Sequence, residues 1–228
     1  AFRDALTGLP NRLHFEERLD ATLAQVGRHA GAMAVLFIDI DGFKAVNESF
    51  GHAAGDEVLR ELGRRLHASA RSQDIVARAG GDEFLMLMVS PGSPEAAAHA
   101  AQELQHAVTA PYRLPNGSEV RLSCSIGIAV FPEHGPISRL IPNADAAMAA
   151  VKRTGGATYA FFEPRMELDA SDQLELQSDL RLAIEQIENL GIRVRAVIAG
   201  HMHDRLSHPR GGLRTRFVRR NGTLFVNS

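Results

Sequence analysis

Helical and strand-like hydrophobic patterns alternate along the first two thirds of the chain. Apolar residues recur every three or four positions over residues 11–29, 52–70, 94–109 and 137–154, which predicts four helices. A near-continuous apolar run over residues 33–38 predicts a strand buried on both faces, ending at Asp39. Further strands are expected at 75–77, 84–89, 120–130 and 158–162. This order predicts an α/β or α+β fold, with helices packed around a central sheet.

A glycine turn with two acids stands between the strands expected at 75–77 and 84–89. Gly80 and Gly81 let the backbone bend sharply and come close to a ligand. Asp82 and Glu83 follow at once, and acids on a turn beside a strand suit a metal-bound phosphate. An ordinary hairpin turn with solvated acids is the alternative interpretation.

A second pair of acids ends the buried strand. Asp39 and Asp41 are costly there unless they are paired or bound to a cation. With Asp82 or Glu83 at a neighbouring strand end, Asp39 is expected to form a small site of oxygen ligands. Such ligands favour magnesium or manganese over zinc. Asp41 has an alternative role, because it can cap a helix that starts at Gly42.

These two elements resemble the GGDEF family, the diguanylate cyclases. The resemblance continues in the family's order through five segments: Asp4–Arg12, Phe37–Lys44, Asn47–Asp56, Ser125–Ala129, and Ala144–Met148 with Lys152. It covers about residues 2–163 and assigns residues 1–163 to one domain. It implies a nucleotide-cyclase-like mixed, mostly antiparallel sheet flanked by helices.

The resemblance implies that the chain condenses two GTP molecules into cyclic di-GMP and releases pyrophosphate, as a bacterial signalling enzyme. It implies two Mg²⁺ or Mn²⁺ ions per active site, bound by Asp39, the carbonyl of Ile40 and Asp82. Asp82 and Glu83 are then the catalytic residues. Substrate-binding positions are Phe43, Lys44, Asn47, His52, Asp56, Gly80, Gly81 and Lys152, with Asn47 and Asp56 matched to guanine and the two lysines to phosphates. The alternatives are surface charges for Lys44 and Lys152, and a helix-start histidine for His52.

Two further expectations concern assembly and feedback. One site holds one GTP, so catalysis implies a functional homodimer with two-fold symmetry. Arg71 and Asp74 match the spacing of the family's product-inhibition site, with a weak surface ion pair as the alternative.

Ala79, Ala149 and Gly156 depart from the family pattern, and Gly156 stands where a phosphate-contacting arginine is common. A catalytically silent GTP- or cyclic di-GMP-binding regulatory module of a GGDEF-EAL type protein is the alternative function.

Composition adds limits to this interpretation. The 228 residues are 45% hydrophobic and 23% charged, with a net charge of −2, which implies no general affinity for nucleic acid. The single cysteine, Cys124, excludes an intramolecular disulfide framework and suits a cytoplasmic domain. No apolar stretch approaches the roughly 18 residues of a membrane helix. The full-length protein is expected to have a sensor or membrane segment upstream or an EAL domain downstream.

The last part of the chain differs in composition. Residues 164–190 are polar with a helical pattern, and the segment Leu174–Ile184 is similar to the connector that leads into an EAL domain. Residues 191–228 form a basic tail of uncertain origin, and residues 187–228 hold eight arginines against two acids. Arg193–His203 and Asn221–Asn227 resemble the end of a calcineurin-like metallophosphoesterase. The other metal-ligand motifs of that family are missing upstream, so a fusion, a truncated gene or an adventitious tail is favoured over a working phosphoesterase.

Overall fold

The computed structural model describes residues 2–26, 32–166, 216–220 and 223–227. Its helices are α1 (Arg12–Val26), α2 (Phe43–Phe50), α3 (His52–Ser69), α4 (Pro94–Thr109) and α5 (Ile137–Arg153). Its strands are β1 (Met33–Asp41), β2 (Ile75–Gly80), β3 (Glu83–Val89), β4 (Tyr112–Arg113), β5 (Glu119–Val120), β6 (Ser123–Phe131), β7 (Tyr159–Phe161), β8 (Arg216–Arg220) and β9 (Thr223–Asn227). The chain divides into two compact units, Ala1–Ala170 and Ser171–Ser228.

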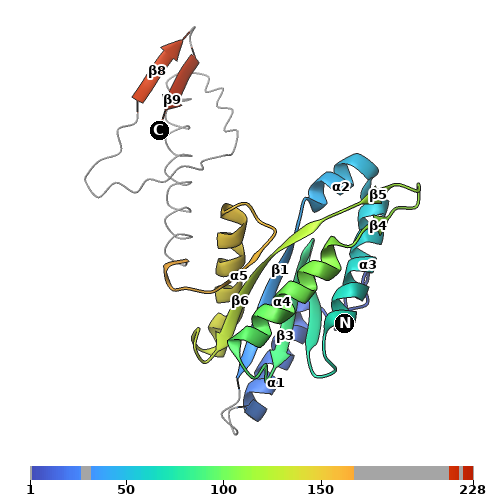
Figure 1. Ribbon diagram of the computed structural model, residues 1–228, viewed down its shortest axis with the longest axis vertical. Coiled ribbons are helices and arrows are strands. Elements are labelled where there is room, and N and C mark those ends of the chain that lie inside the picture. The colour runs from blue at the N-terminus through green and yellow to red at the C-terminus, as the bar shows by residue number, and fades with distance from the viewer. Residues whose placement is uncertain (1, 27–31, 167–215, 221–222, 228) are drawn as a thin grey trace. The chain divides into compact units, whose positions relative to one another are not determined.

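A five-stranded sheet in the order β2-β3-β1-β6-β7 forms the centre of the first unit (Figure 1). The β2–β3, β3–β1 and β1–β6 pairs are antiparallel, whereas β6 and β7 are parallel. The predicted mixed, mostly antiparallel sheet is therefore confirmed. Two separate hairpins, β4–β5 and β8–β9, complete the described strands.

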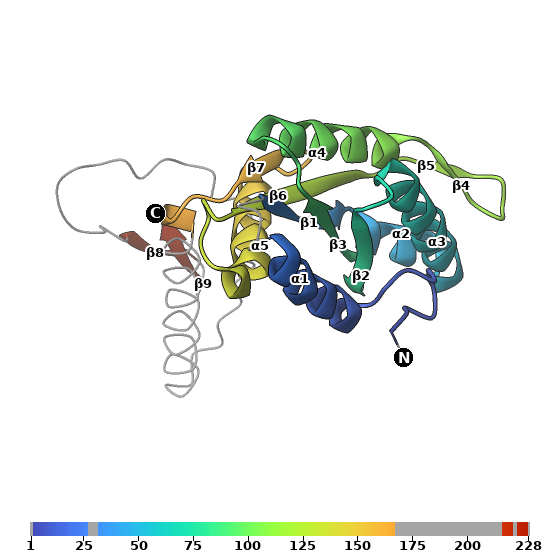
Figure 2. The same cartoon turned by 90° about the horizontal axis from the view of Figure 1, so that it is seen from below.

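Helices cover both faces of this sheet. Even-numbered residues of β1, such as Leu36 and Ile38, pack with α2, α3 and α4 in one core cluster. Odd-numbered residues, such as Val35 and Phe37, pack with α1 and α5 in a second cluster. Figure 2 shows α4 on one side of the strands and α1 with α5 on the other. This two-residue alternation decides which side chains face α5 at the strand ends.

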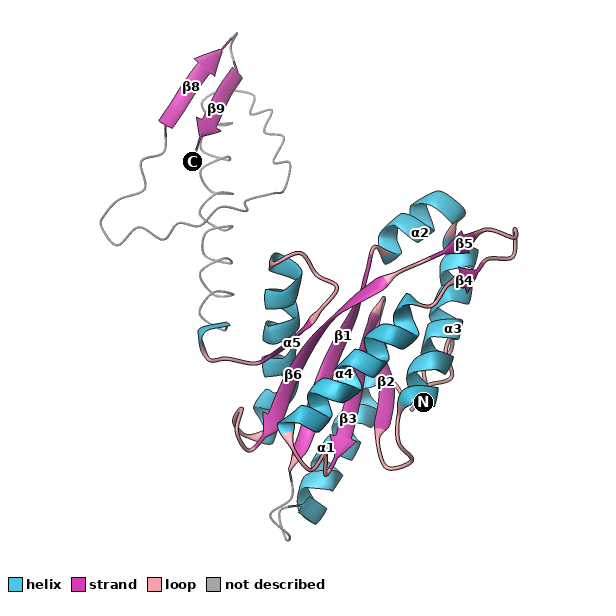
Figure 3. Ribbon diagram, viewed as in Figure 1, coloured by secondary structure: helices cyan, strands magenta, loops and turns pink. Residues whose placement is uncertain are grey.

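Most of the elements expected from periodicity are present, with two differences. The strand expected at 120–130 is divided into the short β5 and the long β6, and a separate helix, α2, precedes α3. Figure 3 shows β1 and β6 side by side in the sheet. The proposed connector lies almost wholly outside the described residues, and only β8 and β9 of the basic tail are described. Among the described helices, none combines the length and apolar character needed to cross a membrane.

Candidate active site

Asp39 is the centre of a polar cluster at one end of the sheet. Its position in β1 is directly opposite Glu83 of β3 and Ser125 of β6. Because Asp39 is odd-numbered, it continues the face of β1 that packs against α5. Its side chain is only 8% exposed, so an ionised carboxylate here needs a nearby positive charge.

Lys152 of α5 supplies that charge. Its Nζ lies 2.5 Å from Asp39 Oδ1, which makes a close ion pair. Burial raises the pKa of Asp39 above its ordinary value, and the charges of Asp82 and Asp41 raise it further. Lys152 offsets part of this rise. The cluster therefore carries more negative charge than the lysine balances, and it favours a further cation.

Glu83 is perturbed in the same direction. Partial burial raises its pKa, and the neighbouring charges of Asp39, Asp145 and Asp82 add to the rise, while Arg12 opposes it. A carboxylate with a raised pKa is a stronger base near neutral pH. Glu83 is therefore suited to proton transfer as well as to charge balance.

A pocket of about 390 Å³ opens beside this cluster. Residues expected to act on substrate or metal line it together: Ile40, Phe43, Lys44, Asp82 and Lys152. Four further residues line it that had not been assigned to substrate or metal: Asp41, Gly42, Gly155 and Gly156. The Ile40 amide donates to the carbonyl oxygen of Asp82 at 3.3 Å, which ties the glycine turn to the end of β1.

The expected capping role of Asp41 is wrong. Gly42 is the N-cap of α2, and no side chain caps that helix. Since β1 continues through Asp41, its side chain shares the face of Asp39 and turns away from α2. The carboxylate instead accepts hydrogen bonds from Ser123 Oγ, Ser125 Oγ and the amide of Ala157. The sequence feature that could have indicated this role is the pair of serines, Ser123 and Ser125, at the start of β6.

Arg78 is a second residue whose role was not predicted. Its guanidinium donates two hydrogen bonds to the Gly81 carbonyl, at 3.0 and 2.7 Å, and pairs with Asp4 at 3.0 Å. The amide and hydroxyl of Thr7 both donate to the same Asp4 carboxylate. The opening segment of the chain thus holds the glycine turn in place. The only sequence signal was that both motifs belong to the same family pattern.

The residues matched to guanine lie on α2 and α3 and do not line the pocket. Asn47 lies against α3, since a Cβ built on Gly55 would be 2.0 Å from Asn47 Oδ1. Asp56 is half-buried and His52 is exposed on the same helix. Lys44 is 88% exposed and lies 3.6 Å from Glu48, a surface ion pair of little energetic weight. Its side chain is free to move toward a ligand.

Gly80 and Gly81 form the turn between β2 and β3 with positive φ values of +153° and +48°. Both are exposed and neither lines the pocket. Asp82 follows them into the pocket wall. The turn therefore positions Asp82 rather than forming the wall itself.

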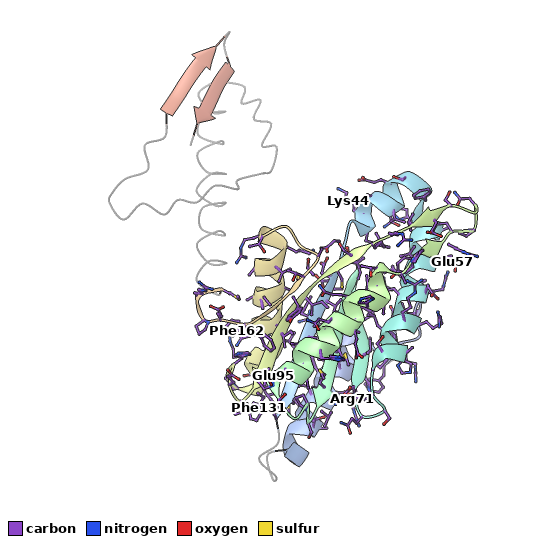
Figure 4. The ribbon with its side chains drawn as sticks, in the orientation of Figure 1. Lys44, Glu57, Arg71, Glu95, Phe131 and Phe162 are labelled. Atoms are coloured by element: carbon purple, nitrogen blue, oxygen red, sulfur yellow. The ribbon has the colours of Figure 1, made fainter. Side chains whose placement is uncertain are left out.

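Arg71 and Asp74 lie beyond the other end of β2 from Gly80. Figure 4 shows Arg71 and Lys44 at opposite ends of the domain. The carboxylate of Asp74 accepts hydrogen bonds from the backbone amides of Arg71 and Val89, both at 3.2 Å. Asp74 is thus held by backbone amides, and the Arg71 guanidinium takes no part in those two bonds.

A divalent cation fits the donors at the end of β1. Asp39 Oδ1 is buried and contacts Lys152 Nζ at 2.5 Å, and the neighbouring charges of Asp41 and Asp82 leave this end of β1 with more acids than the lysine balances. Among the described residues, no three histidine, cysteine or acidic side chains already form a metal-binding group. Asp39 and Asp82 would therefore need the Ile40 carbonyl, water or substrate phosphate as further ligands, as magnesium sites commonly do.

Comparisons with known proteins show the family to which the chain belongs. The family profile described as "Diguanylate cyclase, GGDEF domain" matches residues 1–158. The chain is 45% identical over 187 residues to the bifunctional diguanylate cyclase/cyclic di-GMP phosphodiesterase MucR of Pseudomonas aeruginosa, covering 82% of this chain and 27% of MucR. It is 45% identical over 154 residues to the diguanylate cyclase TpbB of the same species, covering 67% of this chain and 35% of TpbB.

The structural comparison gives the same result. A solved structure comprising only the GGDEF domain of TpbB has a TM-score of 0.72 and 40% sequence identity, covering 74% of this chain and 99% of that one. The chain spans only 27% and 35% of the two curated relatives.

Proposed function

The chain belongs to the GGDEF-domain family of diguanylate cyclases, and we propose that residues 1–163 condense two GTP molecules into cyclic di-GMP. The observation that carries this proposal is the buried carboxylate of Asp39, opposite Glu83 and beside a pocket lined by Asp82 and Lys152. An excess of acids with one lysine suits cation-assisted chemistry on a polyphosphate.

In each half of the reaction, a 3′-hydroxyl oxygen attacks the α-phosphorus of the other GTP. The new bond joins that oxygen to phosphorus, the bond from the α-phosphorus to the bridging oxygen breaks, and pyrophosphate leaves. The hydroxyl proton must be accepted at the acid cluster. Asp82 and Glu83 are the proposed acceptors, and the raised pKa of Glu83 suits this role.

Members of this family are generally dependent on divalent metal ions. We assign Asp39, the Ile40 carbonyl and Asp82 to two Mg²⁺ or Mn²⁺ ions per site. Bound ions would neutralise charge on the phosphates and the leaving pyrophosphate. Lys152 and Lys44 would hold the phosphate end of the nucleotide, because both line the same pocket. Phe43 starts α2 between these segments and fixes the helix against the core.

The guanine end is assigned to Asn47, His52 and Asp56 on α2 and α3. A carboxylate can accept from the N1 and N2 donors of guanine, and an amide can pair with its O6 or N3. Adenine lacks these donors and would leave the polar groups unpaired, at a cost of roughly 1–3 kcal/mol. These residues of α2 and α3 lie outside the pocket, and in this proposal they select GTP over ATP by contacting the guanine of a nucleotide whose phosphates occupy it.

The proposed reaction also has consequences for assembly and feedback. Two domains must face each other, so the active form is a homodimer. Arg71 and Asp74, remote from the pocket, form a product-inhibition site.

The MucR match spans 187 residues and so extends beyond residue 163, which supports a connector in residues 164–190. It also supports an EAL domain or a sensor domain elsewhere in the full-length protein.

The test is incubation with GTP and Mg²⁺, with nucleotides separated by chromatography. Wild-type protein is expected to form cyclic di-GMP from GTP and no cyclic dinucleotide from ATP. Asp82→Ala should lose turnover while keeping the circular dichroism spectrum of the wild type. Asp20→Ala, an exposed aspartate on α1, is the matched control and should keep full activity. Undiminished turnover by Asp82→Ala, or comparable use of ATP, contradicts the assignment.

A further inference from the structure

Three segments of the chain meet at the carboxylate of Asp41, and two of them, the end of β1 and the loop after α5, line the pocket. Ser123 Oγ donates to Asp41 Oδ2 at 2.9 Å, and Ser125 Oγ donates to Oδ1 at 2.8 Å. The Ala157 amide, in the loop after α5, donates to Oδ2 at 3.1 Å. The donors come from β6 and from the loop before β7, while Asp41 itself ends β1. All three donors are neutral, so the carboxylate acts here as a hydrogen-bond acceptor and not as half of an ion pair.

The loop bonded to Asp41 has an unfavourable backbone conformation. Gly156 has a φ of +74° and Ala157 a φ of +57°. A left-handed conformation costs roughly 1–2 kcal/mol for a residue with a Cβ, so Ala157 needs compensation from its surroundings. The Ala157 amide donates one of the three hydrogen bonds that Asp41 accepts. The hydrogen bond therefore stabilises the conformation that the residue would not adopt by itself.

The same loop approaches Asp41 very closely. A Cβ added to Gly156 would lie 3.1 Å from Ser125 Oγ and 3.2 Å from Asp41 Oδ1. Gly156 lines the pocket, and Lys152 lies four residues before it in the last turn of α5. The position of this loop therefore sets the shape of the pocket on the side where Lys152 meets Asp39.

We propose that Asp41 is a positioning residue that fastens the 154–158 loop to β6 and so shapes the phosphate end of the GTP pocket. This inference rests on the proposed function for the identity of the ligand. Asp41 acts through the geometry of its hydrogen bonds, and its negative charge is not required.

Three variants separate geometry from charge. Asp41→Asn keeps the shape of the side chain. Its amide oxygen can accept from Ser123 and Ala157, and its NH₂ group can donate to Ser125, because a serine hydroxyl also accepts. Asp41→Ala removes all three bonds. Ser123→Ala with Ser125→Ala removes the two side-chain donors and leaves Asp41 in place.

The experiment measures two quantities on the full chain, neither of which requires turnover. The first is the hydrogen-exchange rate of the Ala157 amide by NMR, and the second is the dissociation constant of GTP in Ca²⁺ buffer by calorimetry. Asp41→Ala should speed exchange at Ala157 and weaken GTP binding by about 10- to 100-fold, the usual cost of losing a positioning contact. Asp41→Asn should remain within about threefold of wild type in both, and the double serine variant should fall between them.

The outcomes distinguish this inference from the proposed function. If wild-type protein binds GTP but forms no cyclic di-GMP, the cyclase proposal fails while the role of Asp41 is still measured. If Asp41→Ala leaves exchange and binding unchanged, the positioning role is wrong. If Asp41→Asn is as impaired as Asp41→Ala, the charge is required and the inference is also wrong. Should Asp41→Ala fail to fold, the serine double variant decides, since unchanged exchange at Ala157 in that variant contradicts the fastening of the loop to β6.

Discussion

The contact between β6 and α5 allows no side chain at Gly127. A Cβ added there would lie 1.9 Å from the Ala144 carbonyl oxygen and 2.3 Å from the Met148 nitrogen. Both are backbone atoms of α5, so no change of rotamer relieves the overlap. Restoring an ordinary contact of 3.4 Å requires a shift of about 1.5 Å between the helix and the strand. Overpacking of this kind costs roughly 1–3 kcal/mol, and the rigid neighbours favour the upper end.

Gly127→Ala should therefore lower the Tm by about 6–12 °C, given some 2–4 °C per kcal/mol for a domain of this size. The same shift would separate Lys152 on α5 from Asp39 on β1, now 2.5 Å apart, and should weaken GTP binding. The assay combines thermal unfolding by circular dichroism with calorimetric titration of GTP. Gly63→Ala is the matched control, because its added Cβ meets only side-chain atoms of Leu9 and Thr7 and α3 gains helix propensity. A Gly127→Ala protein with the Tm and GTP affinity of the wild type would refute this reasoning.

Three further predictions concern acid stability, the glycine turn and feedback. Hydrogen bonds from Arg64 and Arg65 lower the pKa of Glu61 to about 2, so its contribution to stability is present above its ordinary pKa of 4.5 and is lost toward pH 2. In urea titrations, Glu61→Gln should thus lose less unfolding free energy than wild type between pH 4.5 and pH 2. Equal losses in the two proteins would contradict this prediction. Arg78→Met should release the Gly81 carbonyl and reduce cyclic di-GMP formation about 10- to 100-fold with the sheet intact, and unchanged initial rates would exclude this role. Arg71→Ala should relieve inhibition by added cyclic di-GMP without changing the initial rate, and superimposable inhibition curves would remove Arg71 from the feedback site.

Much of the fold could be predicted because its elements have strong periodicity. The helix expected at 94–109 coincides with α4, since Pro94 starts it and buried apolar residues recur along one face. The glycine turn was predicted between two strands and lies between β2 and β3. The division of residues 120–130 was missed, because Arg121 and Leu122 leave the strand pattern without any glycine or proline to mark the break.

The candidate site was predictable where burial alone decides the matter. A carboxylate buried at the end of an apolar run needs a positive partner or hydrogen-bond donors, and Asp39 has Lys152 as its partner. Contacts between distant segments were not predictable in this way. The pairing of Arg78 with Asp4 depends on how the opening loop packs against β2, and periodicity carries no such information.

Asp41 shows why a correct residue type can receive the wrong role. An aspartate before a helix is a common N-cap, and the sequence alone favours that role. The alternation of β1 decides otherwise, since one more residue of strand turns the Asp41 side chain toward α5 and away from α2. The 154–158 loop, which is bonded to Asp41, also gives Gly156 a structural role at a position where the family commonly has an arginine. With Asp41 Oδ1 only 3.2 Å from any Cβ at that position, the close approach of the loop depends on glycine. Gly155 and Gly156 line the pocket on this side, and Lys44 and Lys152 are the two lysines that line it.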